Sequence, residues 1–283
     1  MEKFIEFIKY LLLGLVQGVT EPLPISSSGH MVIFDQIFGN VVSKEAMNNF
    51  QIAVNFASLL AIIIYYRQLI KQLIVGSWQF LFKSNKEEKP AFLYVLYIIL
   101  ATIPAGIVGL IIKFNNWDQY YTNILVVGIS LFITGLLLLF IAQKQTQAIR
   151  DDVTWKDALL MGGAQVIGLL PGISRSGVTS SVGVANHLKL DKALRFSFMM
   201  YIPASIAAAL LGLYDLINPD EALTEPVFWG GYIGGFIASL VGTYVAITLF
   251  FKLVKHKNIK YFGFYCLLVA TVVLILIATG VFV

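Results

Sequence analysis

The length of the apolar runs constrains this chain more than any other feature of its sequence. Several runs reach the roughly 20 residues that an α-helix needs to cross the hydrocarbon core of a membrane. Of the 283 residues, 58% are apolar and 13% are charged, whereas about 25% of the residues of a soluble domain are charged. We therefore expect an all-α, polytopic membrane protein in which residues 1–283 form a single membrane domain.

Six stretches have the length and composition of complete crossings: 47–66, 91–112, 121–142, 196–214, 227–251 and 261–283. Two others, 5–38 and 156–188, are each divided by a polar centre that contains glycine and proline. Their apolar halves are too short to cross alone, and irregular backbone at membrane depth is tolerated only where protein or water covers it. We predict six transmembrane helices and two re-entrant helical hairpins.

The loop charges predict the orientation of the crossings, because cytoplasmic loops collect lysine and arginine. The loops 67–89 and 252–260 are rich in these residues and are expected inside the cell, whereas 113–120 and 215–225 are poor in them and are expected outside. The two hairpins then enter the membrane from opposite sides. The net charge of +4 is explained by these loops, so nucleic acid is not an expected partner.

The two hairpins share the pattern Q-x7-I-S-x-S-G at the same place in each. The aligned pairs are Gln17 and Gln165, Ile25 and Ile173, Ser26 and Ser174, Ser28 and Ser176, and Gly29 and Gly177. We predict two inverted repeats, about 1–145 and about 150–283. Such repeats, with broken helices that meet near the middle of the membrane, place half-helix N-termini around an anion in known transporters.

The centre of the first hairpin carries a carboxylate, three serines and a histidine. Gln17 and Glu21 are four residues apart and share a helix face. A carboxylate at membrane depth is costly and is retained mainly where it faces a pathway, a metal or a partner. Serines favour helix N-termini, where free N–H groups attract anions, but three in succession exceed what capping needs. The candidate residues are Glu21, Ser26, Ser27, Ser28 and His30; a hydrogen-bonded structural histidine is the alternative for the last.

The centre of the second hairpin carries one basic residue, Arg175, with Ser174 and Ser176 on either side and Thr179 one turn later. The planar guanidinium is always charged, and its fork of N–H groups suits phosphate oxygens. A buried arginine among hydroxyls at a helix N-terminus predicts a phosphate site. The alternative is an ion pair with Glu21 that only joins the two hairpins, and both can hold in the same molecule.

Two longer motifs in these hairpins are specific. One, (E/Q)-x3-E-x2-P-x-S-S-x-G-H, runs from Gln17 to His30, and the other, P-G-x-S-R-S-G-x-T, runs from Pro171 to Thr179. Through them, and in length and order of spans, the chain resembles the bacitracin-resistance type of undecaprenyl-diphosphate phosphatase. The resemblance implies a multi-pass enzyme of the bacterial plasma membrane that removes the terminal phosphate of undecaprenyl diphosphate with a divalent cation, Mg2+ or Ca2+. It also implies that this reaction recycles the lipid carrier of peptidoglycan synthesis and confers bacitracin resistance.

The residues and the resemblance together give candidate roles. We assign catalysis to Glu21, Ser27, His30 and Arg175, substrate binding to Gln17, Ser26, Ser28, Ser174, Ser176 and Thr179, and metal binding to Glu21 and Gln17. Other members have glutamate at the position of Gln17, so this chain has one carboxylate fewer there.

Several questions stay open from the sequence. Ser27, Ser26 or water can be the group that attacks phosphorus, and His30 or Glu21 can accept the proton. The oligomeric state is open, with a homodimer as one option. The alternative function is a transporter or flippase of a lipid phosphate, because it would use the same inverted repeat and anion site.

Overall fold

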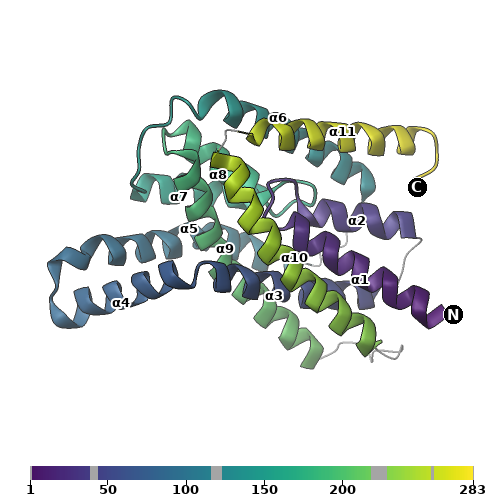
Figure 1. Ribbon diagram of the computed structural model, residues 1–283, viewed down its shortest axis with the longest axis horizontal. Coiled ribbons are helices and arrows are strands. Elements are labelled where there is room, and N and C mark those ends of the chain that lie inside the picture. The colour runs from purple at the N-terminus through teal and green to yellow at the C-terminus, as the bar shows by residue number, and fades with distance from the viewer. Residues whose placement is uncertain (1, 39–43, 116–122, 218–227, 256–257, 283) are drawn as a thin grey trace.

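The computed structural model describes residues 2–38, 44–115, 123–217, 228–255 and 258–282. Within these ranges the chain is helical, as predicted, and its one pairing of extended backbone is an isolated bridge between Arg150 and Leu188. Many of the helices lie alongside one another (Figure 1). In chain order they are α1 (Glu2–Thr20), α2 (Ser27–Phe38), α3 (Lys44–Tyr65), α4 (Arg67–Lys83), the short η1 (Lys86–Glu88), α5 (Lys89–Phe114), α6 (Ile124–Lys144), α7 (Trp155–Ile167), α8 (Arg175–Ala185), α9 (Leu190–Ile217), α10 (Trp229–Lys255) and α11 (Ile259–Ala278).

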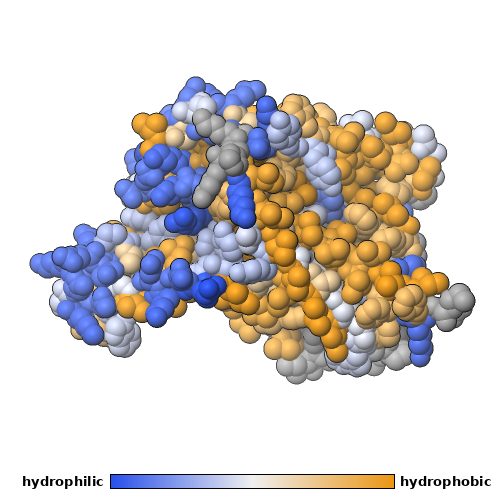
Figure 2. Space-filling model, in the orientation of Figure 1, coloured by the Kyte–Doolittle hydropathy of each residue, from blue (hydrophilic) through white to orange (hydrophobic). Residues whose placement is uncertain are grey.

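Five helical segments in the described ranges are long and apolar enough to cross a membrane: Lys86–Phe114, Ile124–Lys144, Leu190–Tyr214, Trp229–Val254 and Ile259–Ala278. They correspond to five of the six predicted crossings. The sixth, predicted at 47–66, becomes a candidate only when α3 and α4, which meet at a bend of 71°, are counted as one span. Apolar side chains cover much of the helical surface in Figure 2, and hydrophilic residues gather at the α4–α5 end. This distribution is that of a multi-pass membrane protein.

The prediction of a loop at 67–89 is wrong for most of the segment, because residues 67–83 form the helix α4. Its predicted place on the inside of the membrane stays a prediction. The chain then turns through η1 into α5, so α4 and the first turns of α5 make a helical hairpin that projects from the body (Figure 1). Phe80 and Phe92 stack across it with ring centroids 5.0 Å apart. The predicted outside loops at 113–120 and 215–225 lie largely outside the described residues.

Both stretches that were predicted to be divided are broken helices. Between α1 and α2 the chain passes Pro22 and Pro24, and Ser26 adopts a left-handed φ of 68°. Between α7 and α8, Gly172 has a φ of 89°, a region in which glycine carries no steric penalty. A new helix, α2 or α8, therefore begins after each break. The first N–H groups of these two helices have no partner within their own helix.

Close helix contacts join segments that are far apart in the sequence. α1 packs against α10, and α7 packs against α5. A Cβ atom on Gly14 would lie 2.2 Å from the carbonyl oxygen of Gly235, and one on Gly18 would lie 2.3 Å from that of Ser239. α7 approaches α5 in the same way at Gly162. Small residues at such crossings let backbones come together where lipid leaves no hydrophobic force between helices.

The contact at Gly14 predicts a large cost for adding one methyl group. We expect Gly14→Ala to destabilise the fold by about 1 to 3 kcal/mol, because the obstructing atoms belong to backbone that cannot move aside. The matched control is Gly109→Ala in α5, where a new Cβ would meet nothing within 4 Å and alanine favours the helix. Apparent melting temperatures in detergent should fall by several degrees for the first variant and stay or rise for the second; equal shifts would contradict the close contact.

Candidate active site

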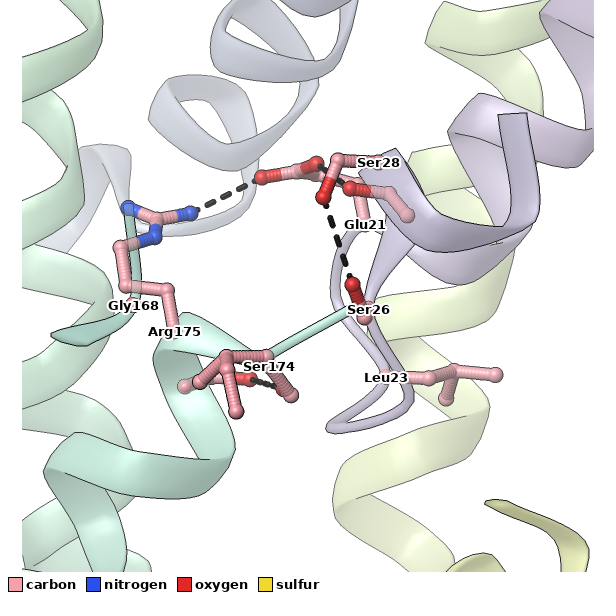
Figure 3. A pocket seen from close by; sticks show the side chains of 10 residues that line it. Glu21, Leu23, Ser26, Ser28, Gly168, Ser174 and Arg175 are labelled. Carbon is pink, nitrogen blue, oxygen red and sulfur yellow. Dashed lines mark hydrogen bonds and ion pairs between the residues drawn. The ribbon is translucent and has the colours of Figure 1, made fainter. Parts of the chain in front are cut away.

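The two helix breaks face each other and enclose a cavity of about 100 Å3 (Figure 3). The breaks touch directly, since a Cβ atom on Gly29 would lie 2.9 Å from the Cα atom of Gly172. The cavity takes its polar lining from both hairpins. The predicted site residues that line it are Glu21, Ser26, Ser27, Ser28, Ser174, Arg175 and Ser176.

The N-terminus of α8 is fixed at the cavity by two hydroxyl groups. Ser174 caps the helix, and its Oγ accepts a hydrogen bond from the Gly177 N–H at 3.1 Å. Thr134 of α6 secures the turn before the cap: its Oγ1 donates to the Gly172 carbonyl at 2.9 Å and accepts from the Ser174 N–H at 3.0 Å. These bonds orient the start of α8, with its positive end of the helix dipole, toward the cavity.

At the N-terminus of α2 the three serines have different hydrogen-bond partners. The Ser26 Oγ accepts from the Gly29 N–H at 3.3 Å and lies 3.3 Å from the Ser28 Oγ. Ser26 is therefore the capping residue, as its left-handed φ and its place before the helix also indicate. Ser27 has a different partner, because its hydroxyl donates to Glu21 at 2.6 Å. This bond connects Ser27, rather than the capping Ser26, to the carboxylate.

Glu21 is the centre of the site. Its Oε1 accepts a hydrogen bond from the Arg175 Nη2 at 2.9 Å, and its Oε2 accepts from the Ser27 Oγ at 2.6 Å and from the Gln17 Nε2 at 2.8 Å. The side chain of Glu21 is 8% exposed and that of Arg175 is 22% exposed. The buried carboxylate is thus paired and hydrogen-bonded, which offsets the cost of placing it inside the protein. The ion pair that the sequence left as an alternative is present, and it also holds the candidate nucleophile.

Two residues that the sequence did not single out complete this arrangement. Tyr201 of α9 is buried, and its ring lies under the guanidinium of Arg175, with 3.8 Å between the Cζ atom and the ring centroid. Asn55 of α3 accepts from the Gln17 Nε2 at 2.6 Å through its Oδ1. Each lies inside a predicted crossing, where the sequence shows only a single polar residue among apolar ones. The uncommon placement of asparagine at membrane depth was the one available signal.

His30 and Thr179 do not line the cavity. The His30 Nδ1 lies 2.7 Å from the Ser26 carbonyl, which can only accept, so Nδ1 carries the proton and Nε2 accepts from the Tyr265 hydroxyl at 2.9 Å. Thr179 donates to the Arg175 carbonyl at 2.8 Å and lies 2.7 Å from the Ser197 Oγ. In this arrangement His30 supports the turn that carries the serines, and Thr179 joins α8 to α9.

The donor set around Glu21 fits a magnesium ion that the substrate helps to bind. Glu21 is the one acidic residue that lines the cavity, and the amide side chains of Gln17 and Asn55 are next to it. Within the described part of the chain there is no group of three His, Cys, Asp or Glu side chains that would hold a metal alone. Mg2+ usually binds through one or two carboxylates plus substrate phosphates, and a half-turn of the Gln17 amide would present its oxygen.

These features define a class: an integral membrane protein with a polar cavity, lined by serines and a Glu–Arg pair, where two broken helices meet. The comparison with protein families is specific within that class. Residues 10–272 match the family model described as bacitracin resistance protein BacA, and the chain belongs to this family.

Curated relatives agree with the family match over nearly the whole chain. One, from Oceanobacillus iheyensis, is 42% identical over 279 residues, which cover 97% of this chain and 98% of the relative. Another, from Acholeplasma laidlawii, is 40% identical and covers 96% and 98% of the two chains. Both are named undecaprenyl-diphosphatase, and a Bacillus cereus relative that is 39% identical is named undecaprenyl-diphosphatase 1.

Proposed function

We propose that this protein is a membrane phosphatase that hydrolyses undecaprenyl diphosphate to undecaprenyl phosphate and inorganic phosphate. The observation that carries the proposal is the hydrogen bond from Ser27 to Glu21, next to Arg175. It is found in a chain of the bacitracin resistance protein family, whose relatives reported above are named undecaprenyl-diphosphatase. The reaction returns the lipid carrier to peptidoglycan synthesis. It also removes the diphosphate form of the lipid, which accounts for the family's link to bacitracin resistance.

The diphosphate binds in the cavity between the two helix breaks. Arg175 and the N-terminus of α8 neutralise the phosphate oxygens, and Ser28, Ser174 and Ser176 supply hydroxyl groups around them. The ring of Tyr201 holds the guanidinium of Arg175 in place by a cation–π contact. Positioning and charge neutralisation are the main contributions of a protein to phosphoryl transfer, and these residues provide both.

The hydrolysis proceeds through Ser27. Its Oγ attacks the terminal phosphorus, the bond from that phosphorus to the bridging oxygen breaks, and undecaprenyl phosphate leaves with the bond's electron pair. Glu21 accepts the Ser27 proton along the existing 2.6 Å hydrogen bond. Water then attacks the phosphorus of the phosphoserine, the bond from phosphorus to the Ser27 Oγ breaks, and inorganic phosphate leaves while Glu21 returns its proton to that Oγ. Of the two proposed bases, Glu21 is favoured by the hydrogen bonds, because both nitrogens of His30 have other partners.

A divalent cation supports this reaction when it is bound. Glu21, with the amide oxygens of Gln17 and Asn55, would hold Mg2+ beside the diphosphate, where the ion supplies positive charge to the phosphate oxygens. Ca2+ is the alternative ion. In the absence of the cation, Gln17 instead donates to Glu21 and keeps the carboxylate in position.

The architecture that supports this site is two inverted repeats with six crossings and two re-entrant hairpins. The helix pairs agree with this interpretation: α1 of the first half packs against α10 of the second, and α7 of the second half packs against α5 of the first. The glycines at these crossings, Gly14 and Gly162, occupy corresponding places in the aligned halves. The two Q-x7-I-S-x-S-G segments then form the two breaks of one cavity.

The first test is phosphate release from undecaprenyl diphosphate by the purified protein in detergent. We expect release with Mg2+, loss of release with EDTA, and loss in Glu21→Ala. Detergent has no membrane sides, so a transporter or flippase would release no phosphate under these conditions. If the folded wild-type protein binds the lipid but releases no phosphate, lipid-phosphate transport replaces hydrolysis as the proposed function.

A further inference from the structure

A second cavity, of about 240 Å3, lies between the α4–α5 hairpin and the N-terminal end of α9. It shares no lining residue with the first cavity. One wall is apolar and comes from the helical hairpin, whereas the opposite end is basic and comes from α9. The residues that matter here are Leu69, Leu73 and Pro90 on the apolar wall, and Lys192 and Arg195 at the basic end.

Among the described residues that line this cavity, Arg195 is a cation without an ion pair. Asp151 also lines it, but its carboxylate lies 2.6 Å from the Lys189 Nζ and 3.5 Å from the Lys192 Nζ. Lys189 interacts with Asp191 as well. In the part of the chain that the structure describes, no hydrogen bond or ion pair engages the guanidinium of Arg195. The basic end of the cavity therefore has capacity for an anion.

The helix that forms the apolar wall also carries an exposed apolar stripe. Ile74, Trp78, Leu81 and Phe82 are between 54% and 67% exposed, and their spacing places them on one face of α4. Lys71 lies one turn before the stripe, and Gln72, Gln79 and Lys83 lie along one flank of it. A helix with this pattern lies in the headgroup layer of a membrane, with its apolar face toward the acyl chains. Lipid head groups would consequently lie at the mouth of the cavity.

We propose that this cavity binds the phosphate of an anionic phospholipid from the cytoplasmic leaflet. Arg195 and Lys192 contact the phosphate oxygens, for which the arginine fork is well suited, and Leu69 and Leu73 contact the start of an acyl chain. Basic pockets beside membrane-spanning helices on the cytoplasmic side bind acidic lipid head groups in other proteins. The bound lipid joins the projecting α4–α5 hairpin to α9, because the two walls of the cavity belong to these elements.

The test is lipid binding to the full-length protein, measured by native mass spectrometry from detergent. The probes are phosphatidylglycerol, phosphatidylcholine and, as a soluble source of the same group, glycerol phosphate. We expect wild-type protein to retain phosphatidylglycerol in preference to phosphatidylcholine. The double variant Lys192→Gln with Arg195→Gln should lose about tenfold or more of this affinity, and Arg195→Lys should lose less.

The matched control is Lys252→Gln with Lys260→Gln, which removes the same charge from a different basic segment, and it should bind as wild type does. An equal loss in this control would show general attraction to acidic lipid and overturn the proposed site. So would equal binding of phosphatidylcholine, or displacement of phosphatidylglycerol by glycerol phosphate at matched concentration. An unchanged elution volume and melting temperature of the double variant establishes that its fold is intact, so that its affinity decides the result.

Discussion

Replacement of Arg175 by alanine is expected to lower kcat/KM for undecaprenyl diphosphate by about a thousandfold or more. An arginine that neutralises charge in phosphoryl transfer contributes about this much, and here it also fixes the base, since its Nη2 donates to Glu21. Arg175→Lys should lose about a hundredfold, because lysine keeps the charge but gives up the two-pronged contact and the stack on Tyr201. The measurement is steady-state phosphate release in detergent with Mg2+.

The control for Arg175 must separate lost chemistry from lost stability. Removal of one partner from a buried ion pair leaves an uncompensated charge that costs about 3 to 5 kcal/mol, so Arg175→Ala should also melt earlier. Arg175→Ala with Glu21→Gln removes both charges and should recover stability without recovering activity. Arg67→Ala, at an exposed arginine that donates to the Ile64 carbonyl outside the cavity, should keep full activity. Activity of Arg175→Ala within tenfold of wild type would place the phosphate elsewhere.

Ser27→Ala is expected to abolish turnover and the formation of a phosphoenzyme. The structure separates Ser27 from its neighbour: Ser27 donates to Glu21, whereas Ser26 caps α2. Loss of a capping serine costs about 1 kcal/mol of stability, so Ser26→Ala should retain most of the activity. Rapid quenching after addition of substrate labelled in the terminal phosphate should find labelled serine in wild type and in Ser26→Ala, but not in Ser27→Ala.

Two results would revise the role of Ser27. If Ser27→Ala retains most of its activity and no labelled serine forms in wild type, water is the attacking group and Glu21 activates it directly. If Ser26→Ala is the inactive variant and Ser27→Ala is not, the serines exchange roles and the left-handed turn at Ser26 has to change when substrate binds. His30→Gln, which keeps the hydrogen-bond donor toward the Ser26 carbonyl, would then test whether the histidine acts through that turn.

The sequence predicted five of the spans and both breaks because their signals are local. Runs of apolar residues, and prolines or glycine next to serines, determine where a helix in lipid begins and ends. The helix α4 was missed because five basic residues in 67–89 favoured a loop, although Leu69 and Leu73 already had helical spacing. A helix that lies along the surface of a membrane can carry such charges on one face.

The sequence could not assign roles to Tyr201, Asn55 or Thr134, because these roles depend on contacts between distant helices. Tyr201 acts on Arg175 from α9, and Thr134 reaches the second break from α6. The same reason explains His30, which was proposed next to Ser27 from its position in the motif. Its ring is held by the Ser26 carbonyl and by Tyr265 of α11, a helix that is far away in the sequence.

The packing of α1 against α10 has a consequence for how the protein is made. The ribosome releases Gly14 and Gly18 near the start of synthesis, but their backbone contacts on Gly235 and Ser239 emerge only near its end. Until then α1, the first half of the hairpin, is in the membrane without the helix against which it packs most closely. We expect a chain released before α10 to contain both serine motifs but to lack the helix against which α1 packs.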